Sequence, residues 1–168
     1  MATANYDDAG LNLPDLDQPE SYRIGFVVAE WNEEITQNLF QGGFDTLIDA
    51  GVIKENIVKW NVPGSFELVY GAKKMAESFD MLDAIVVIGN VIQGETKHFD
   101  FVCQGVTNGI QQLNVEGDIP VIFCVLTDNN IEQSKARSGG EKGNKGVEAA
   151  MAALKMGKLK RDAKFYKD

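Results

Sequence analysis

The sequence predicts an α/β fold, a three-layer α/β/α sandwich around a four-stranded parallel sheet. Four runs rich in β-branched and aromatic residues recur at residues 22–29, 57–62, 84–92 and 120–126. Each is followed by a segment with helical spacing of its apolar residues. The third run is almost entirely apolar, as expected of a central parallel strand that helices cover on both faces. This β-α alternation favours layers of helices on a parallel sheet.

The first strand, at residues 22–29, is followed by a helix expected over about residues 33–50. Asn32 is the expected N-cap, because its side-chain oxygen can accept a hydrogen bond from a free N–H of the first turn. Gly51 closes the helix. Its inward face is expected to carry Ile35, Leu39, Phe44, Leu47 and Ile48.

The second strand, at residues 57–62, ends before Pro63, because proline has no N–H for a central ladder. Ser65 is the expected N-cap of a helix that runs through Ser78. The inward positions of this helix are expected to be Phe66, Leu68, Val69, Ala72, Met75 and Ala76.

The third strand, at residues 84–92, leads through a glycine-containing turn into a helix over about residues 98–113. The fourth strand, at residues 120–126, precedes a short helix at residues 131–136. A final helix over about residues 147–156 is followed by a basic tail with Lys158, Lys160 and Arg161.

The chain of 168 residues is long enough for one domain with a sizeable core. We divide it into an N-terminal arm, residues 1–21, and a single α/β domain, residues 22–168. The arm is polar, carries Pro14 and Pro19, and has no sustained apolar period. It is expected either to stay loose or to lie on a neighbouring subunit, and composition leaves both open.

The chain is acidic, with 25 acidic and 16 basic residues and a formal net charge of −9 at pH 7. This balance argues against a general binder of nucleic acid or of anionic membranes. A local positive site must therefore hold any anionic ligand. We expect no signal peptide, and no apolar run approaches the ~20 residues of a membrane-spanning helix.

The two cysteines, Cys103 and Cys124, lie in apolar periodic segments and lack the paired spacing of a zinc site. They are expected to be buried thiols in a reducing compartment, which predicts a cytoplasmic protein. A catalytic cysteine is the alternative. The position of Cys124 in the middle of the fourth strand favours packing in the core.

The stretch 89–101, GNVIQGETKHFDF, joins the third strand to its helix and holds the only histidine, His98. Backbone N–H groups at a glycine-containing turn and at a helix start favour an anion, so this turn is a candidate phosphate cradle. Thr96 can add a hydroxyl group, and His98 can shuttle a proton. The alternative is an ordinary strand-to-helix turn with a histidine at the surface.

Trp31 and Glu67 follow the first two strands, so they belong to the same edge of the sheet as the stretch 89–101. In open α/β sheets this carboxyl edge is where ligands bind. Trp31 is either a stacking platform or a plug in the core. Glu67 is either an acceptor for ligand hydroxyl groups or a charge that complements the helix dipole.

Several motifs follow one another along the chain. They are the Trp31-Asn32 pair, VPGSFEL at residues 62–68, GNVIQGETKHFD at residues 89–100, PVIF and VLT at residues 120–123 and 125–127, and EQ, RSGG and GNKG at residues 132–133, 137–140 and 143–146. Such an ordered set is far more specific than any one motif. Together, over roughly residues 22–156, they resemble the 6,7-dimethyl-8-ribityllumazine synthase family.

The resemblance implies a flavodoxin-like fold and an enzyme of riboflavin biosynthesis, which condenses 5-amino-6-(D-ribitylamino)uracil with 3,4-dihydroxy-2-butanone 4-phosphate. It implies that His98 is the catalytic proton donor and acceptor. The residues that it implies for the pyrimidine and the ribityl chain are Trp31, Ser65, Phe66, Glu67, Asn90, Val91, Ile92, Phe123 and Lys145. Those that it implies for the butanone phosphate are Glu95, Thr96 and Arg137.

The resemblance also implies a homopentamer, with twelve pentamers in an icosahedral capsid as the larger alternative, because Phe123, Arg137 and Lys145 reach the site from the adjacent subunit. It implies no metal and no redox cofactor. Two residues depart from the family's pattern. Glu95 puts a carboxylate beside the phosphate site, and Glu141 stands where a lysine is frequent.

Two other functions compete with this interpretation. A flavodoxin-like module that only binds a flavin or a lumazine would share the sheet and the tryptophan but would not need His98 with Arg137. A purely structural shell protein would assemble without activity. A response-regulator-like domain is disfavoured, because only Glu30 stands at the end of the first strand where an acidic cluster is required.

Overall fold

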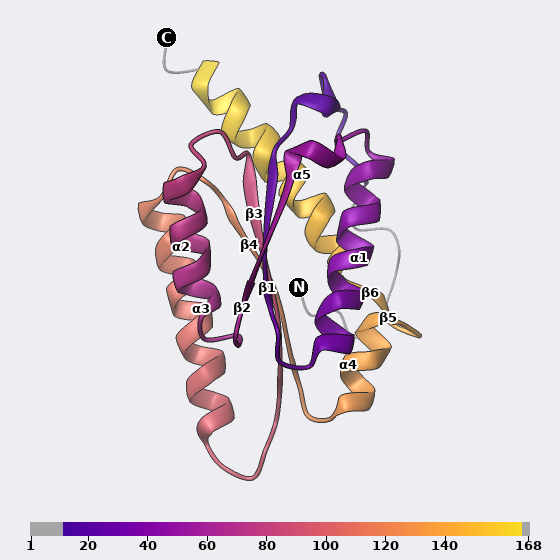
Figure 1. Ribbon diagram of the computed structural model, residues 1–168, viewed down its shortest axis with the longest axis vertical. Coiled ribbons are helices and arrows are strands. Elements are labelled where there is room, and N and C mark those ends of the chain that lie inside the picture. The colour runs from indigo at the N-terminus through magenta and orange to yellow at the C-terminus, as the bar shows by residue number, and fades with distance from the viewer. Residues whose placement is uncertain (1–11, 166–168) are drawn as a thin grey trace.

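The computed structural model describes residues 12–165 (Figure 1). Its main sheet has four strands: β1 (Ile24–Ala29), β2 (Ile57–Val62), β3 (Ala84–Ile92) and β4 (Val121–Asp128). The helices of this part of the chain are α1 (Glu33–Asp49), α2 (Leu68–Ser78), α3 (His98–Glu116), α4 (Ile131–Arg137) and α5 (Lys145–Phe165). All pairings in the main sheet are parallel. The predicted α/β fold with a four-stranded parallel sheet is therefore confirmed.

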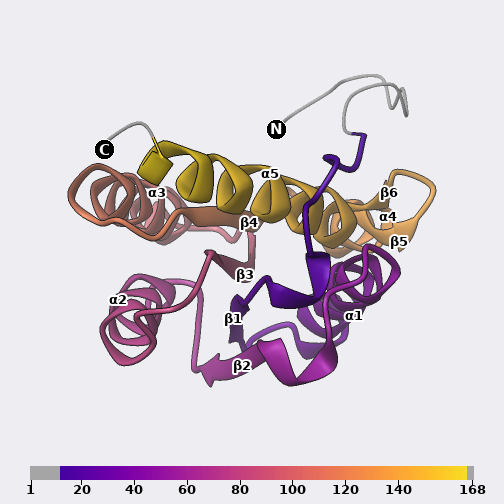
Figure 2. The ribbon, with the colours of Figure 1, turned by 90° about the horizontal axis from the view of Figure 1, so that it is seen from above.

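The strand order β2-β1-β3-β4 determines where a crevice opens. The chain starts in the middle of the sheet with β1, adds β2 on one side, and then crosses to β3 and β4 on the other. The connections after β1 and β3 therefore run to opposite faces, and they separate at the carboxyl edge of the sheet. Figures 1 and 2 show α2 and α3 on one face and α1, α4 and α5 on the other.

Two apolar clusters, one on each face of the sheet, hold the layers together. Phe26 and Leu154 belong to the cluster under α1 and α5, and Val27 and Leu68 to the cluster under α2 and α3. Full burial of such a side chain contributes about 1.5–3 kcal/mol relative to exposure. Cys124 is buried in the first cluster, which confirms its predicted place in the core.

The predicted core face of α1 is right in part. Ile35, Leu39 and Leu47 are buried, but Phe44 is half-buried and Ile48 is 38 % exposed. Leu47 is fully buried, and the next position of a helix lies about 100° further round its axis, so Ile48 turns toward the solvent.

The start of α2 differs from the prediction. The helix begins at Leu68, and residues 65–67 form turns before it. Ser65 does not cap the helix: its side chain is buried beside Gly89, and its Oγ makes no hydrogen bond with the described residues. Phe66 was expected to face inward, but it is 58 % exposed and its ring lies against Gly105 of α3, where a Cβ atom would meet it at 2.7 Å.

The predicted basic tail is wrong, because α5 continues to Phe165 and includes these residues. Arg161 makes two hydrogen bonds of 2.7 Å to the carboxylate of Asp83, and Lys160 donates one to the carbonyl of Leu82. These contacts with the segment before β3 hold the last turns of α5 on the domain. The segment has no apolar period, so its own sequence did not indicate a helix.

A short antiparallel pair of strands, β5 (Ser138–Gly140) and β6 (Gly143–Asn144), joins α4 to α5 and was not predicted. Gly139 and Gly143 have φ values of 119° and 72°, which residues other than glycine rarely adopt. These two glycines thus allow the tight turn between β5 and β6, which places the start of α5 beside α1.

Part of the predicted arm, residues 1–11, lies outside the described residues. The rest of it packs on the domain. Leu16 is half-buried against the core cluster under α1, a 3-10 helix spans Pro19–Ser21, and Arg161 donates hydrogen bonds to Ser21. No helix within residues 12–165 is long and apolar enough to cross a membrane.

Candidate active site

A cleft of about 730 Å³ opens at the carboxyl edge of the sheet, between the connections that follow β1, β2 and β3. We call it the edge cleft. Eight of the predicted site residues line it, so the structure brings these parts of the sequence together. They are Trp31, Ser65, Phe66, Glu67, Asn90, Val91, Ile92 and His98.

Trp31 stands at the rim of the edge cleft and is 73 % exposed, so it is not a plug in the core. Its backbone N–H donates to the carbonyl of Pro63, 3.2 Å away, which ties it to the end of β2. The next residue, Asn32, has a φ of 58° and does not cap α1 with its side chain, contrary to the prediction. Its side-chain amide instead donates to the carbonyl of Asn90 at 3.3 Å. The indole face is thus held open to a ligand.

Ser65 brings a buried hydroxyl group to the edge cleft. The residue is 6 % exposed, and its Oγ has no hydrogen-bond partner among the described residues. A buried polar group without a partner costs about 1–3 kcal/mol. A ligand hydroxyl that reached Ser65 would remove this cost. Glu67, exposed at the rim, adds a carboxylate that can accept further hydrogen bonds.

His98 is the first residue of α3 and lines the edge cleft with its side chain exposed. Its backbone N–H donates to Thr96 Oγ1 at 3.3 Å, so the threonine hydroxyl helps to start the helix. Glu95 and Thr96 are exposed in the connection before α3 and do not line the cleft itself. The predicted phosphate cradle is therefore an open loop beside the histidine.

Four residues that line the edge cleft were not predicted as site residues: Asn32, Gly64, Phe101 and Val102. Phe101 and Val102 follow His98 by three and four positions, and Phe101 is 68 % exposed. Residues at these spacings share one face of a helix. Phe101 lies within the stretch 89–101, so the sequence contained this signal. An apolar residue three or four positions along a helix is, however, equally typical of a face that packs in the core.

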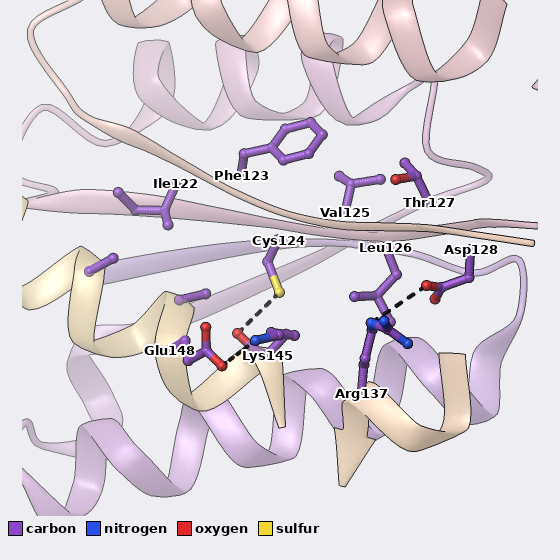
Figure 3. Close-up of a pocket in the computed structure, with 12 residues that line it drawn as sticks. Ile122, Phe123, Cys124, Val125, Leu126, Thr127, Asp128, Arg137, Lys145 and Glu148 are labelled. Atoms are coloured by element: carbon purple, nitrogen blue, oxygen red, sulfur yellow. Dashed lines mark hydrogen bonds and ion pairs between the residues drawn. The ribbon is translucent and has the colours of Figure 1, made fainter. Parts of the chain in front are cut away.

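The other predicted residues, Phe123, Arg137 and Lys145, line a second cleft of about 520 Å³ along β4 (Figure 3). We call it the β4 cleft. Strand β4 is the edge strand on its side of the sheet, so one of its long sides is unpaired. Figure 3 shows Phe123 on one side of this strand, with Arg137 and Lys145 on the other.

Arg137 is the last residue of α4 and is oriented by two neighbours. Its Nη1 donates to the carbonyl of Gln133 at 3.1 Å, and its Nε lies 3.8 Å from Oδ1 of Asp128. The second distance is an ion pair without a direct hydrogen bond. Because a guanidinium has five N–H donors, most of them remain available to an anion.

Lys145 is placed by the GNKG motif, whose asparagine and second glycine lock α5 to α1. Asn144 donates to the carbonyl of Asn38 at 2.9 Å and accepts from the N–H of Gly146 at 2.8 Å. A Cβ atom at Gly146 would lie 1.8 Å from the carbonyl oxygen of Leu39, so only glycine fits there. Lys145 itself pairs with Glu148 at 2.5 Å.

Cys124 contributes to the wall of the β4 cleft and is unsuited to nucleophilic chemistry. Burial raises the pKa of its thiol to about 12, and its Sγ faces the carbonyl of Lys145 at 3.6 Å. Within residues 12–165, no group of three or more His, Cys, Asp or Glu side chains could hold a metal ion.

The edge cleft and the β4 cleft share no lining residue. The first offers an aromatic platform, hydroxyl-binding groups and an imidazole, and the second offers an arginine and a lysine. The structure is thus an α/β protein with two separate clefts, one with an aromatic rim and a histidine and the other with two cationic side chains.

Comparisons with known proteins place this chain in one family. A model of the 6,7-dimethyl-8-ribityllumazine synthase family matches residues 21–161. The chain is 68 % identical to the 6,7-dimethyl-8-ribityllumazine synthase of Christiangramia forsetii over 167 residues, which cover 99 % of both chains. It is 57 % identical to that of Flavobacterium johnsoniae over 163 residues, 97 % of this chain and 85 % of the relative. The chain therefore belongs to the 6,7-dimethyl-8-ribityllumazine synthase family.

Proposed function

We propose that this protein condenses 5-amino-6-(D-ribitylamino)uracil with 3,4-dihydroxy-2-butanone 4-phosphate, releasing phosphate and water. Membership of the lumazine synthase family makes it a transferase of riboflavin biosynthesis. One observation supports this proposal most strongly: eleven of the predicted site residues line two clefts, and the two clefts have no residue in common. A complete site then forms where the edge cleft of one copy meets the β4 cleft of the next.

The edge cleft would bind the ribitylaminouracil. The exposed indole of Trp31 would stack on the pyrimidine ring, and the backbone of residues 90–92 would pair with its polar edge. Ser65, Phe66 and Glu67 would hold the ribityl chain. The buried, unpartnered hydroxyl of Ser65 supports this assignment, because a sugar hydroxyl can satisfy it.

The neighbouring copy would contribute Phe123, Arg137 and Lys145. The guanidinium of Arg137 suits a phosphate, because its planar fork can donate two parallel hydrogen bonds. Thr96 and the backbone N–H groups of its loop would complete the phosphate site. The carboxylate of Glu95 would repel the phosphate, so we assign a role to its backbone alone.

The mechanism needs orientation of two substrates and transfer of protons. The amine attacks the ketone, and loss of water from the adduct gives an imine. Phosphate then leaves by elimination, and the ring closes with loss of a second water. His98, exposed beside the cleft, would take and return the protons, which typically contributes ~10²–10⁴-fold. Orientation in the cleft would supply much of the remaining acceleration. None of these steps calls for a metal or a redox cofactor.

We further propose a homopentamer as the smallest active unit, with twelve pentamers in a shell as the larger alternative. A ring of five copies lets each edge cleft meet one β4 cleft, which is the closed, heterologous arrangement that cyclic symmetry provides. The acidic charge and the cysteines support a cytoplasmic protein that binds small molecules and neither nucleic acid nor membranes.

Mixing two inactive variants tests the shared site. His98→Ala and Arg137→Ala subunits are prepared separately, dissociated, mixed and reassembled, and lumazine formation is followed by absorbance. Random reassembly puts an intact edge cleft against an intact β4 cleft at about a quarter of the interfaces. We therefore expect about a quarter of wild-type activity from the mixture and far less from either variant alone.

The controls separate the competing functions. If the mixture is no more active than its components, the site lies within one copy and the proposed assembly is wrong. If wild-type protein binds lumazine but does not form it from the two substrates, the binding module is the better function. Assembly without binding or turnover would indicate a structural shell.

A further inference from the structure

Three buried polar side chains form a chain of contacts beneath the β4 cleft. Asp128, Ser134 and Asn90 are 7 %, 0 % and 4 % exposed. Ser134 Oγ, on α4, lies 2.9 Å from Oδ2 of Asp128 at the end of β4 and 3.1 Å from the amide oxygen Oδ1 of Asn90 on β3. Desolvation of such polar groups opposes folding, so we expect their burial to serve a structural or functional role.

The hydroxyl proton of Ser134 determines the direction of this chain. One proton serves two neighbours, and an ionised carboxylate is a stronger acceptor than a neutral amide. Ser134 therefore donates to Asp128. The atom of Asn90 that lies 3.1 Å from Ser134 Oγ is the amide oxygen Oδ1, and Nδ2 of Asn90 has no hydrogen-bond partner among the described residues. The hydrogen bond from Ser134 stabilises the negative charge of this carboxylate.

The carboxylate of Asp128 also lies close to the guanidinium group of Arg137. The other carboxylate oxygen, Oδ1, lies 3.8 Å from Nε of the arginine, and both residues line the β4 cleft. The carboxylate is nearly buried, whereas the guanidinium side chain is 35 % exposed and faces the cleft. A phosphate that bound Arg137 would therefore enter the field of a fixed negative charge that water screens poorly.

The geometry also shows that Asp128 is not the main support of Arg137. The distance of 3.8 Å exceeds a hydrogen bond, while Gln133 accepts one from Nη1 at 3.1 Å. Loss of the charge of Asp128 would therefore change the electrostatics of the guanidinium more than its position.

Building on the proposed function, we infer that Asp128 acts through Arg137 and competes with phosphate for its guanidinium group. In the empty site the carboxylate balances the charge of the guanidinium. When the butanone phosphate binds, the arginine is shared between two anions, so phosphate is held less tightly. After the elimination step the same competition favours release of inorganic phosphate. The substrate keeps its additional contacts and is less affected.

Asp128→Asn tests this inference. Asparagine has the same shape, keeps an oxygen that accepts from Ser134, and leaves the backbone bond from Gln93 to the carbonyl of residue 128 intact. Titration calorimetry of the assembled protein with inorganic phosphate is expected to show roughly three- to tenfold tighter binding than in wild type. The KM for the butanone phosphate should fall by less, and inhibition by inorganic phosphate should strengthen.

Glu132→Gln is the matched control, because it makes the same charge change at an exposed position of α4, the helix that carries Arg137. Solvent screening should keep its phosphate affinity within about twofold of wild type. The double variant Asp128→Asn with Arg137→Ala should lose the gain, because the competition needs the guanidinium. A gain that persists in the double variant would overturn the role through Arg137.

The remaining outcomes separate this inference from the function on which it rests. If Arg137→Ala weakens phosphate binding but Asp128→Asn does not strengthen it, the inference is wrong and the proposed function stands. If Arg137→Ala leaves phosphate binding unchanged, phosphate does not bind at Arg137. Both the inference and the proposed phosphate site would then be wrong. An equal loss of affinity in Asp128→Asn and Ser134→Ala would indicate a purely structural network and would also overturn the inference.

Discussion

The side-chain amide of Asn32 donates a hydrogen bond to the backbone carbonyl of Asn90, 3.3 Å away, and so joins the carboxyl ends of β1 and β3. Asn32 adopts a φ of 58° to reach this position, which is unusual for a residue other than glycine. Trp31 precedes it directly. The orientation of the proposed stacking platform thus depends on a residue that the sequence indicated only as a helix cap.

Replacement of Asn32 separates backbone strain from the hydrogen bond. Asn32→Ala should lower the free energy of unfolding by about 1–2 kcal/mol, because alanine is strained at this φ and loses the contact with Asn90. Asn32→Gly removes the same contact without the strain and should cost clearly less. Urea denaturation of both variants measures the difference. Equal losses would show that the positive φ contributes nothing.

Ser65→Ala should affect binding and stability in opposite ways. The buried hydroxyl has no partner in the free protein, so its removal should leave the free energy of unfolding unchanged or slightly higher. The affinity for the ribitylaminouracil should fall about five- to tenfold, since a ligand hydrogen bond is lost. Calorimetric titration and thermal unfolding are the two measurements. A destabilised variant with full affinity would place the partner of Ser65 within the protein.

His98→Ala should act on turnover and not on binding. We expect kcat to fall by ~10²–10⁴-fold, the usual contribution of a positioned acid and base. The KM of either substrate should change by no more than a few fold, because the side chain is exposed at the edge cleft and is not buried in its walls. Steady-state kinetics with each substrate varied in turn tests this. A large rise in KM at constant kcat would mean that His98 binds substrate and does not transfer protons.

Arg161→Ala should be among the most destabilising changes on the exterior of the domain. Its guanidinium makes two hydrogen bonds of 2.7 Å to Asp83, whose side chain is 8 % exposed, and it stacks on Tyr22 at 3.7 Å. Removal would leave a buried carboxylate without its cation, at a cost of about 3 kcal/mol.

The exposed pair of Lys158 and Asp162, one turn away on the same helix, supplies the control for Arg161. Lys158→Ala should cost about 0.5 kcal/mol or less, because solvent screens that pair. Chemical denaturation of both variants provides the comparison. Similar losses would mean that the contact of Arg161 with Asp83 adds nothing beyond a surface ion pair.

Cys124 should make the protein less stable in alkaline solution. Burial raises the pKa of its thiol to about 12, whereas a thiol in the unfolded chain ionises near pH ~8.5. Above the latter pH the unfolded state loses a proton that the folded state keeps, so stability falls as pH rises. The expected slope is about 1.4 kcal/mol per pH unit up to the folded pKa.

The alanine variants of the two cysteines isolate this effect. Cys124→Ala should show a flatter decline between about pH 8.5 and 10 than wild type, by about 2 kcal/mol at the upper end. Cys103→Ala should change the slope less. Its thiol is only half-buried, although burial also raises its pKa. Identical pH profiles for wild type and Cys124→Ala would rule out the buried thiol as the cause.

Local signals predicted the strands well. The bounds of β2 and β3 agree with the prediction, because Pro63 ends one strand and an unbroken apolar run defines the other. Local signals were less reliable for helices that distant contacts extend or shorten. The predicted start of α2 was wrong because the Ser65 side chain is buried beside Gly89. The end of α5 was missed because hydrogen bonds to Leu82 and Asp83 hold its last turns.

The amino-acid sequence by itself determined the α/β class, the parallel sheet and the motifs that indicate a lumazine synthase. These follow from periodicity and spacing, which are properties of neighbouring residues. Only the tertiary structure decided that most of the predicted site residues fall into two clefts, that Trp31 is exposed, and that Asp128 lies 3.8 Å from Arg137 at the end of a chain of buried contacts. The contact of Asn90 with Ser134 joins positions 44 residues apart. Such contacts depend on how helices and strands pack, which no local pattern specifies.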